Sequence, residues 1–261
     1  MTTINDIMNA FGIVAPLKLA EDFDNAGLLV GDPSCSVDKV LVALDITQSV
    51  IEEAIELSCG LIVSHHPLFF KLGKTINPGV CPEGKLFSLL ENKIAAICMH
   101  TNMDIAKSGV NDMLIEKIGL APCGSFSVVD DSLESYIGRL GKTNAPMSAV
   151  EFAKQVKLSL GCDGVKVLDA GKAVNVVGVV GGAGGGMAKE AQDAGCDTYV
   201  TSEVKHHQFI EALELGINLI DAGHYYTERF ITDRFEEILS KFDTLKVFRS
   251  KTLDSDIVKV V

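Results

Sequence analysis

The stretch Cys59-Gly-Leu-Ile-Val-Ser-His-His-Pro67 decides the fold of this chain. Its apolar residues Leu61 to Val63 lie between a glycine and a histidine pair, which is the pattern of a short buried strand. Upstream, Val37 to Leu44 predicts another strand, and Thr47 is placed to cap a helix that Gly60 would end. Strand, helix and strand in this order predict a parallel α/β sheet.

The same alternation continues along the rest of the chain. A loop rich in glycine and proline is expected at 67–82, and residues 121–131 are expected to form a crossover. Predicted helices cover 4–11, 84–91, 110–118, 148–160, 187–194, 208–215 and 227–241, and predicted strands cover 94–98, 135–140, 164–168, 175–180, 197–200, 217–220, 245–248 and 257–261.

Two segments of the chain look alike. Residues 40–66 and 176–207 each read as strand, helix, strand and then two adjacent histidines, which suggests a divergent duplication. We therefore expect an α/β fold with two similar lobes and mainly parallel sheets. The predicted lobes are residues 1–124 plus 222–261 and residues 125–221.

Composition limits the classes of protein that fit. The chain of 261 residues is 47% hydrophobic, 6% aromatic and free of tryptophan, so its core is expected to be aliphatic. No apolar stretch is long enough for a membrane span, and Met1 to Asp6 lack the features of a secretory signal, so a cytoplasmic location is expected. The seven scattered cysteines contain no Cys-x-x-Cys pair, which favours reduced, mostly buried thiols over disulfides or metal ligands.

Charge makes some partners improbable. A net charge of −12 opposes binding along nucleic acid, although a local patch at Lys71, Lys74 and Lys85 leaves that alternative open. A small anionic ligand is compatible with this charge, because a site with two metal ions carries its own positive charge.

Histidines with metal-ligand spacing follow three predicted strands. His65 and His66 are adjacent. His100 precedes Asp104 by four residues, and His224 precedes Glu228 by four residues. Residues four apart share a face of a helix, and ligands of α/β sheets bind beyond the carboxyl ends of the strands. Imidazole with carboxylate suits Zn, Fe, Mn or Co.

The histidine pair indicates two ions. Consecutive side chains in extended chain point opposite ways, so His65 and His66 are each expected to serve a different ion, with Asp104 or Glu228 between the two. The ions of such sites lie roughly 3.5–4 Å apart. Asp104 has the alternative of capping a helix, and His100 is open between ligation, a bond to a ligand, and acid–base work.

Two other features receive plainer interpretations. His206 and His207 are interpreted as the solvated start of a helix, beside Lys205 and Glu203. The run Gly181-Gly-Ala-Gly-Gly-Gly186 is interpreted as a tight turn between strand and helix rather than as a phosphate cradle.

Six motifs give the chain a family resemblance that spans nearly its whole length. It resembles the GTP cyclohydrolase I type 2 homologues, also called Ngg-interacting-factor-three-like proteins. Phe23 stands where that family usually has tryptophan, and residues 181–186 are looser than in the family. The motifs are Glu21-Asp-Phe-Asp-Asn-Ala-Gly-Leu28, Ala43-Leu-Asp-Ile-Thr47, Ser64-His-His-Pro-Leu68, His100-Thr-Asn-Met-Asp104, Thr201-Ser-Glu203 and Gly223-His-Tyr-Tyr-Thr-Glu228.

The resemblance implies a metal centre between the two lobes, at the carboxyl edge of the strands. It implies that one ion is held by His65 and Asp104, that the other is held by His66 and His224, and that Glu228 bridges both. It also implies a ring-shaped homohexamer.

The function hypothesis is a metal-dependent hydrolase in which a metal-activated water attacks carbon or phosphorus, with His100 as the proton shuttle. The family name points to GTP, or a related nucleotide, and opening of the purine ring. The alternative is a metal-binding scaffold or regulatory protein without catalysis.

Overall fold

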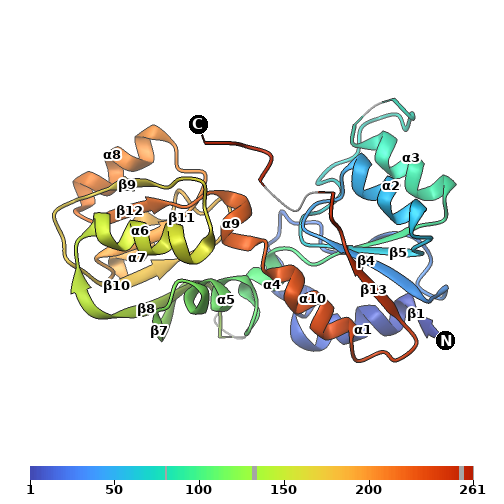
Figure 1. Ribbon diagram of the computed structural model, residues 1–261, viewed down its shortest axis with the longest axis horizontal. Helices are drawn as coiled ribbons and strands as arrows, with labels where there is room; N and C mark the ends of the chain where they lie inside the picture. The colour runs from blue at the N-terminus through green and yellow to red at the C-terminus, as the bar shows by residue number, and fades with distance from the viewer. Residues whose placement is uncertain (80, 131–133, 253–255, 261) are drawn as a thin grey trace. The chain divides into compact units, whose positions relative to one another are not determined.

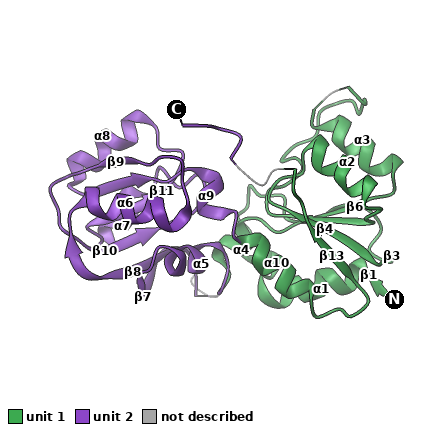
Figure 2. Cartoon of the chain, viewed as in Figure 1, with its two compact units in different colours: residues 1–106, 231–255 green, residues 107–230, 256–261 purple. Residues whose placement is uncertain are grey.

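The computed structural model describes residues 1–79, 81–130, 134–252 and 256–260, which form two compact units (Figures 1 and 2). The first unit consists of Met1–Ala106 and Ile231–Ser255, and the second of Lys107–Phe230 and Asp256–Val261. Each unit contains its own sheet with helices packed on it, so the α/β class expected from the sequence is confirmed.

The first unit is built on a five-stranded sheet in the order β13-β4-β5-β6-β2. Its first four strands are parallel and β2 is antiparallel to β6. The elements are β1 (Thr2–Thr3), α1 (Ile4–Val14), a 3-10 turn (Leu17–Leu19), β2 (Gly27–Val30), β3 (Ser36–Val37), β4 (Lys39–Ala43), α2 (Gln48–Glu56), β5 (Leu61–Ser64), α3 (Glu83–Glu91), β6 (Ala95–Cys98), α4 (Thr101–Ile105), α10 (Ile231–Leu239) and β13 (Lys246–Arg249).

Helices cover both faces of this sheet, which explains its runs of apolar residues. Leu41 and Ile62 belong to a core cluster that includes residues of α2 and α3. On α1 and α10, the rings of Phe11 and Phe235 meet edge to face with centroids 5.4 Å apart, and α10 also contacts β4. When a strand is buried on both faces, its functional side chains lie at its ends, where the backbone leaves the sheet.

The start of α2 agrees with the sequence prediction, and its end does not. The Thr47 side chain accepts a hydrogen bond from the Val50 N–H at 3.2 Å, as a helix cap does. The helix ends at Glu56 rather than at Gly60. Ser58, with a φ of 57°, makes the left-handed turn that was expected of the glycine.

The second unit is built on a six-stranded sheet in the order β7-β8-β10-β11-β12-β9. Its centre, β10-β11-β12, is parallel, and the outer strands are antiparallel. The elements are α5 (Val110–Lys117), β7 (Ala121–Asp130), β8 (Ser135–Met147), α6 (Ala149–Leu160), β9 (Lys166–Leu168), β10 (Val174–Val179), α7 (Ala188–Asp193), β11 (Thr198–Thr201), α8 (His206–Leu215), β12 (Asn218–Asp221) and α9 (His224–Glu228).

The units differ from the predicted lobes over residues 107–124, 222–230 and 256–261, which group with the second unit. Helix α5 contacts β8 and β10, and α9 contacts α5, so tertiary contacts decide the division. His224 and Glu228 therefore belong to the second unit, whereas His65 and Asp104 belong to the first.

Three element predictions are corrected by the structure. Residues 121–130 form strand β7 rather than a crossover; its proline and glycine lie at a register shift against β8, where such residues are tolerated. Residue 131 lies outside the described residues. The helix expected at 227–241 is two helices, α9 and α10, because the chain passes from one unit to the other between Phe230 and Ile231. The described residues of 257–261 form no strand.

Two predictions from composition can also be compared with the structure. No helix in the described part of the chain combines the length and the apolar character that a bilayer crossing requires. Four of the seven cysteines are buried as free thiols: Cys59, Cys98, Cys162 and Cys196.

Candidate metal centre

His65 and His66 lie at the carboxyl end of β5, the middle strand of the first sheet. Both backbone N–H groups donate to the Leu44 carbonyl, at 3.2 and 2.9 Å, which fixes the chain as it leaves the strand. The His65 side chain is fully buried and that of His66 is 19% exposed. Their ring centroids are 5.0 Å apart. The rings do not point to opposite sides as expected, because both residues follow the last strand residue, Ser64.

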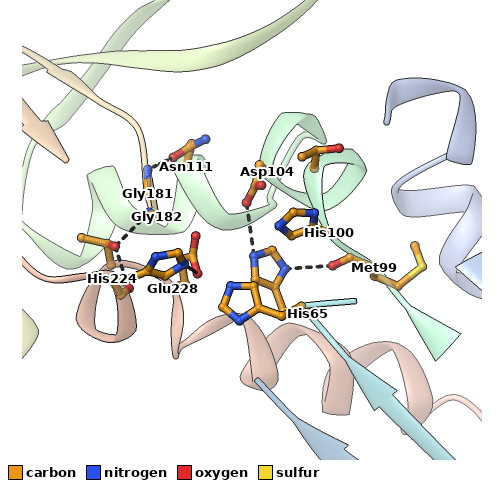
Figure 3. A network of polar contacts seen from close by, with 12 residues as sticks. His65, Met99, His100, Asp104, Asn111, Gly181, Gly182, His224 and Glu228 are labelled. Atoms are coloured by element: carbon orange, nitrogen blue, oxygen red, sulfur yellow. Dashed lines mark hydrogen bonds and ion pairs between the residues drawn. The ribbon is translucent and has the colours of Figure 1, made fainter. Parts of the chain in front are cut away.

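The ring of His65 is oriented by a backbone carbonyl. His65 Nδ1 lies 2.8 Å from the Met99 carbonyl oxygen (Figure 3). A carbonyl can only accept, so Nδ1 donates its proton, and the neutral ring carries its lone pair on Nε2. That nitrogen lies 3.5 Å from Asp104 Oδ1. Two potential metal ligands, His65 Nε2 and Asp104 Oδ1, therefore lie side by side on buried residues.

The ring of His66 is oriented in the same manner by a carboxylate. His66 Nδ1 lies 2.8 Å from Asp45 Oδ1, and an ionised carboxylate accepts. The lone pair of the neutral ring is again on Nε2. Metal-binding histidines usually donate their other ring N–H to a carboxylate or a carbonyl, which fixes the tautomer and raises the basicity of the ligand nitrogen.

His100 is held by a carboxylate with a strongly lowered pKa. His100 Nδ1 lies 2.7 Å from Asp24 Oδ1, and Thr101 donates to the same carboxylate from its N–H and its hydroxyl. Burial raises the pKa of Asp24, but the hydrogen bonds from His100 and Thr101 outweigh burial and hold that pKa at about 2. Asp24 is therefore ionised at neutral pH.

The three imidazoles of the first unit converge. His65, His66 and His100 each offer a ring nitrogen within 4.8 Å of the other two, a grouping that can hold a metal ion. Helix α4 begins only at Thr101, so His100 lies outside the helix that carries Asp104, and Asp104 pairs with His65 instead. The expected helical pairing of His100 with Asp104 is replaced by this arrangement.

The predicted pair of the second unit does lie on one helical turn. His224 and Glu228 are the first and last residues of α9, and His224 Nε2 is 2.9 Å from Glu228 Oε2. The other ring nitrogen, Nδ1, is 2.7 Å from Glu203 Oε1. Glu228 is buried, with 3% of its surface exposed. This pair again joins an oriented imidazole to a buried carboxylate (Figure 3).

Three carboxylates that orient the rings had no role predicted from the sequence. Asp24, Asp45 and Glu203 stand in motifs that carry the family resemblance, and each accepts from one imidazole. A usable signal was present for two of them, because Asp45 and Glu203 follow β4 and β11, the strands beside β5 and β12. By contrast, His206 and His207 are exposed at the start of α8, as interpreted.

Ligand chemistry in both units fits a first-row transition metal. Imidazole nitrogens and carboxylate oxygens are the donors of zinc, iron, manganese and cobalt sites, whereas calcium prefers oxygen alone. An imidazole whose Nδ1–H is already held by an oxygen acceptor presents Nε2 as the nitrogen that can bind a cation.

A family model for Duf34/NIF3 (NGG1p interacting factor 3) matches residues 2–255. The chain belongs to the Duf34/NIF3 family. Its relatives in that family include a GTP cyclohydrolase 1 type 2 homolog of Clostridium perfringens, 35% identical over 86% of each chain. A GTP cyclohydrolase 1 type 2 of Helicobacter pylori is 31% identical over 94% of this chain and 95% of that protein. The resemblance seen in the motifs is thereby confirmed.

Solved structures share the fold of this Duf34/NIF3 protein. A hypothetical protein of Staphylococcus aureus aligns with a TM-score of 0.86 and 27% identity over 99% of both chains. HcgD of Methanocaldococcus jannaschii, in its reduced form, aligns with a TM-score of 0.80 and 32% identity over 95% of this chain and 97% of its own.

Proposed function

We propose that this protein is a hydrolase that depends on two divalent metal ions per chain. His65 and Asp104 would hold one ion, His66 and His224 the other, and Glu228 would bridge the two. The observation that carries the proposal is the orientation of four imidazoles, each with Nδ1 fixed on an oxygen acceptor within its own unit. Histidines that bind metal usually donate their other ring N–H to an oxygen acceptor in this way.

Charge supports binding of a cation by these residues. Asp104 and Glu228 are both buried, and burying an ionised carboxylate is costly unless a positive charge lies nearby. A bound divalent cation would supply that charge, and it would polarise the atom under attack and lower the pKa of a coordinated water.

His100 is assigned the movement of protons. Its Nδ1–H is fixed on the ionised Asp24, so Nε2 is the atom that accepts and returns a proton. The side chain is 15% exposed, which leaves it accessible to a small substrate and to water. The ring of Phe70, which is exposed, packs against His100 with centroids 5.8 Å apart.

The proposed substrate is GTP or a related nucleotide, as the names of the relatives suggest. The reaction would be hydrolysis of a carbon–nitrogen bond in the purine ring, in which water gives its oxygen to carbon and a proton to nitrogen. The net charge of −12 is compatible with a nucleotide phosphate, because bound metal ions would supply local positive charge.

The test is turnover by protein loaded in turn with zinc, iron, manganese and cobalt. We expect loss of the 8-position proton signal of GTP and formation of an opened ring, with His66→Ala inactive and the exposed His207→Ala fully active. Absence of turnover with every metal would refute the substrate. If metal still bound, the non-catalytic scaffold would be favoured.

The predicted homohexamer belongs to the same proposal. Light scattering after size-exclusion chromatography would then give six times the mass of one chain, and a monomer would refute it. The cytoplasmic location also remains a prediction of the sequence.

A further inference from the structure

The glycine-rich turn after β10 lies against the carboxylate of Glu228. Gly182 has a φ of 64°, in the left-handed region. A methyl group added at its Cα would overlap Glu228 Oε1 and lie 3.3 Å from His224 Nε2. We propose that Gly182 is a positioning residue, whose bare Cα leaves the space in which the Glu228 carboxylate must lie to bind metal.

The backbone at this turn is fixed on all sides. The Gly182 N–H donates to Thr227 Oγ1 at 3.0 Å. Its carbonyl accepts from the Ser202 N–H at 3.1 Å and from the Ser202 hydroxyl. The preceding Gly181 N–H donates to Asn111 Oδ1 at 2.7 Å. Thr227, Ser202 and Asn111 are all fully buried, so the turn is anchored from three separate elements or loops.

A side chain at position 182 would therefore displace the carboxylate rather than the backbone. Moving the turn would break several buried hydrogen bonds and leave their partners unsatisfied, which is costly. Rotating Glu228 changes the rotamer of one side chain and leaves those backbone hydrogen bonds intact. The rotation would also separate Glu228 Oε2 from His224 Nε2, which now lie 2.9 Å apart.

Residue 182 consequently controls metal affinity without binding metal. The inference rests on the proposed role of Glu228 as a metal ligand. It assigns a role to Gly182 within the run 181–186, which was interpreted from the sequence only as a turn between strand and helix. Outer residues that orient metal ligands typically change metal affinity by roughly 10–100-fold.

The experiment is a zinc titration of metal-stripped protein, with wild type, Gly182→Ala and Gly171→Ala compared by calorimetry. Gly171 is the matched control, because its φ is 78° and a methyl group there would meet nothing within 4 Å. Gly182→Ala is expected to bind zinc roughly 10–100-fold more weakly, and Gly171→Ala to bind as wild type does. Thermal unfolding of the metal-free proteins shows whether each variant folds.

A second variant separates positioning from general damage. Glu228→Asp withdraws the carboxylate by one methylene, so it removes the clash with the methyl group that Gly182→Ala adds. The shortening should cost much less affinity in the Gly182→Ala background than in wild type, which is a coupling that a purely structural defect would not produce.

The titrations distinguish failure of the inference from failure of the proposed function. Equal zinc affinity of wild type and Gly182→Ala, or additive losses in the double variant, would overturn the inference while leaving the metal site standing. Absence of zinc binding by wild type would overturn the proposed function itself. If Gly182→Ala fails to fold, Gly182→Ala with Glu228→Asp must recover folding, and failure to do so would also overturn the inference.

Discussion

The two units each hold a histidine with a carboxylate at the ends of neighbouring parallel strands, but they use different strands of the sheet. Each has three parallel strands in chain order, β4-β5-β6 in the first and β10-β11-β12 in the second. In both units, a histidine after one strand is held by a carboxylate after the strand before it. His66 follows β5 and bonds to Asp45 after β4, whereas His224 follows β12 and bonds to Glu203 after β11.

The pair of histidine and carboxylate follows the first two of the three parallel strands in the first unit and the last two in the second unit. In the second unit the end of the first strand, β10, carries no orienting carboxylate and instead carries Gly181 and Gly182. A methyl group added at Gly182 would overlap Glu228 Oε1. In the first unit the same position carries Asp45. The corresponding strand ends of the two sheets therefore carry different groups.

The largest expected effect is loss of a ligand from either unit. His65→Ala and His224→Ala should each weaken metal binding by more than about 100-fold, beyond the roughly 10–100-fold that an orienting residue controls. Metal content after dialysis measures this. If one variant kept full metal content, the units would not share the site, and the comparison would fail.

The next effect tests the two orienting carboxylates against each other. Asp45→Asn and Glu203→Gln should each weaken metal binding roughly 10–100-fold, because the amide no longer fixes the imidazole tautomer. Asp45→Asn should have the larger effect, since the Asp45 side chain is 43% exposed and that of Glu203 is 57% exposed. Competition with a chromophoric chelator gives both affinities. Glu211→Gln, exposed on α8, is the control and should change nothing.

A smaller effect concerns the first unit alone, whose pair of His100 with Asp24 lies outside the correspondence drawn above. The folded pKa of Asp24 is about 2, below the unfolded value of 3.8. The carboxylate therefore stabilises the fold above pH 4, and this stability is lost as pH falls towards 2. Asp24→Asn should lower the free energy of unfolding by about 2 kcal/mol at pH 7.

Urea denaturation across a pH series checks the Asp24 prediction. The difference between Asp24→Asn and wild type should shrink below pH 4. A difference that stayed constant down to pH 2.5 would show that the ionised form of Asp24 contributes nothing.

The smallest effect concerns His206 and His207, which occupy the place of the His65 and His66 pair in the second of the two similar sequence segments. Both are exposed at the start of α8. His206→Ala and His207→Ala should leave metal content unchanged and alter the free energy of unfolding by less than about 0.5 kcal/mol. A loss of metal in either variant would mean that the second unit repeats the first more closely than its contacts show.

Local pattern was enough to predict much of this fold. Apolar strands such as Leu61–Ser64 and a capped helix such as α2 are encoded within a few residues. Strand β7 was missed because Pro122 and Gly124 are turn residues in most contexts, and only pairing with β8 accommodates them. The break between α9 and α10 was missed because it reflects which unit each half packs in.

The orienting contacts could not be read from spacing. His66 and Asp45 are 21 residues apart, and His100 and Asp24 are 76 apart. Such pairs meet because of strand order, which the sequence pattern does not state. The approach of Glu228 to Gly182 is likewise a property of the folded second unit.

We have proposed that each chain binds two metal ions, one through His65 and Asp104 and the other through His66 and His224. Elemental analysis of freshly purified protein, with ions counted per chain in wild type and in His66→Ala, tests it most directly. We predict two first-row transition-metal ions per wild-type chain and fewer in the variant. Wild-type protein that held no such metal, and that took up none when zinc, iron, manganese or cobalt was supplied, would contradict the claim.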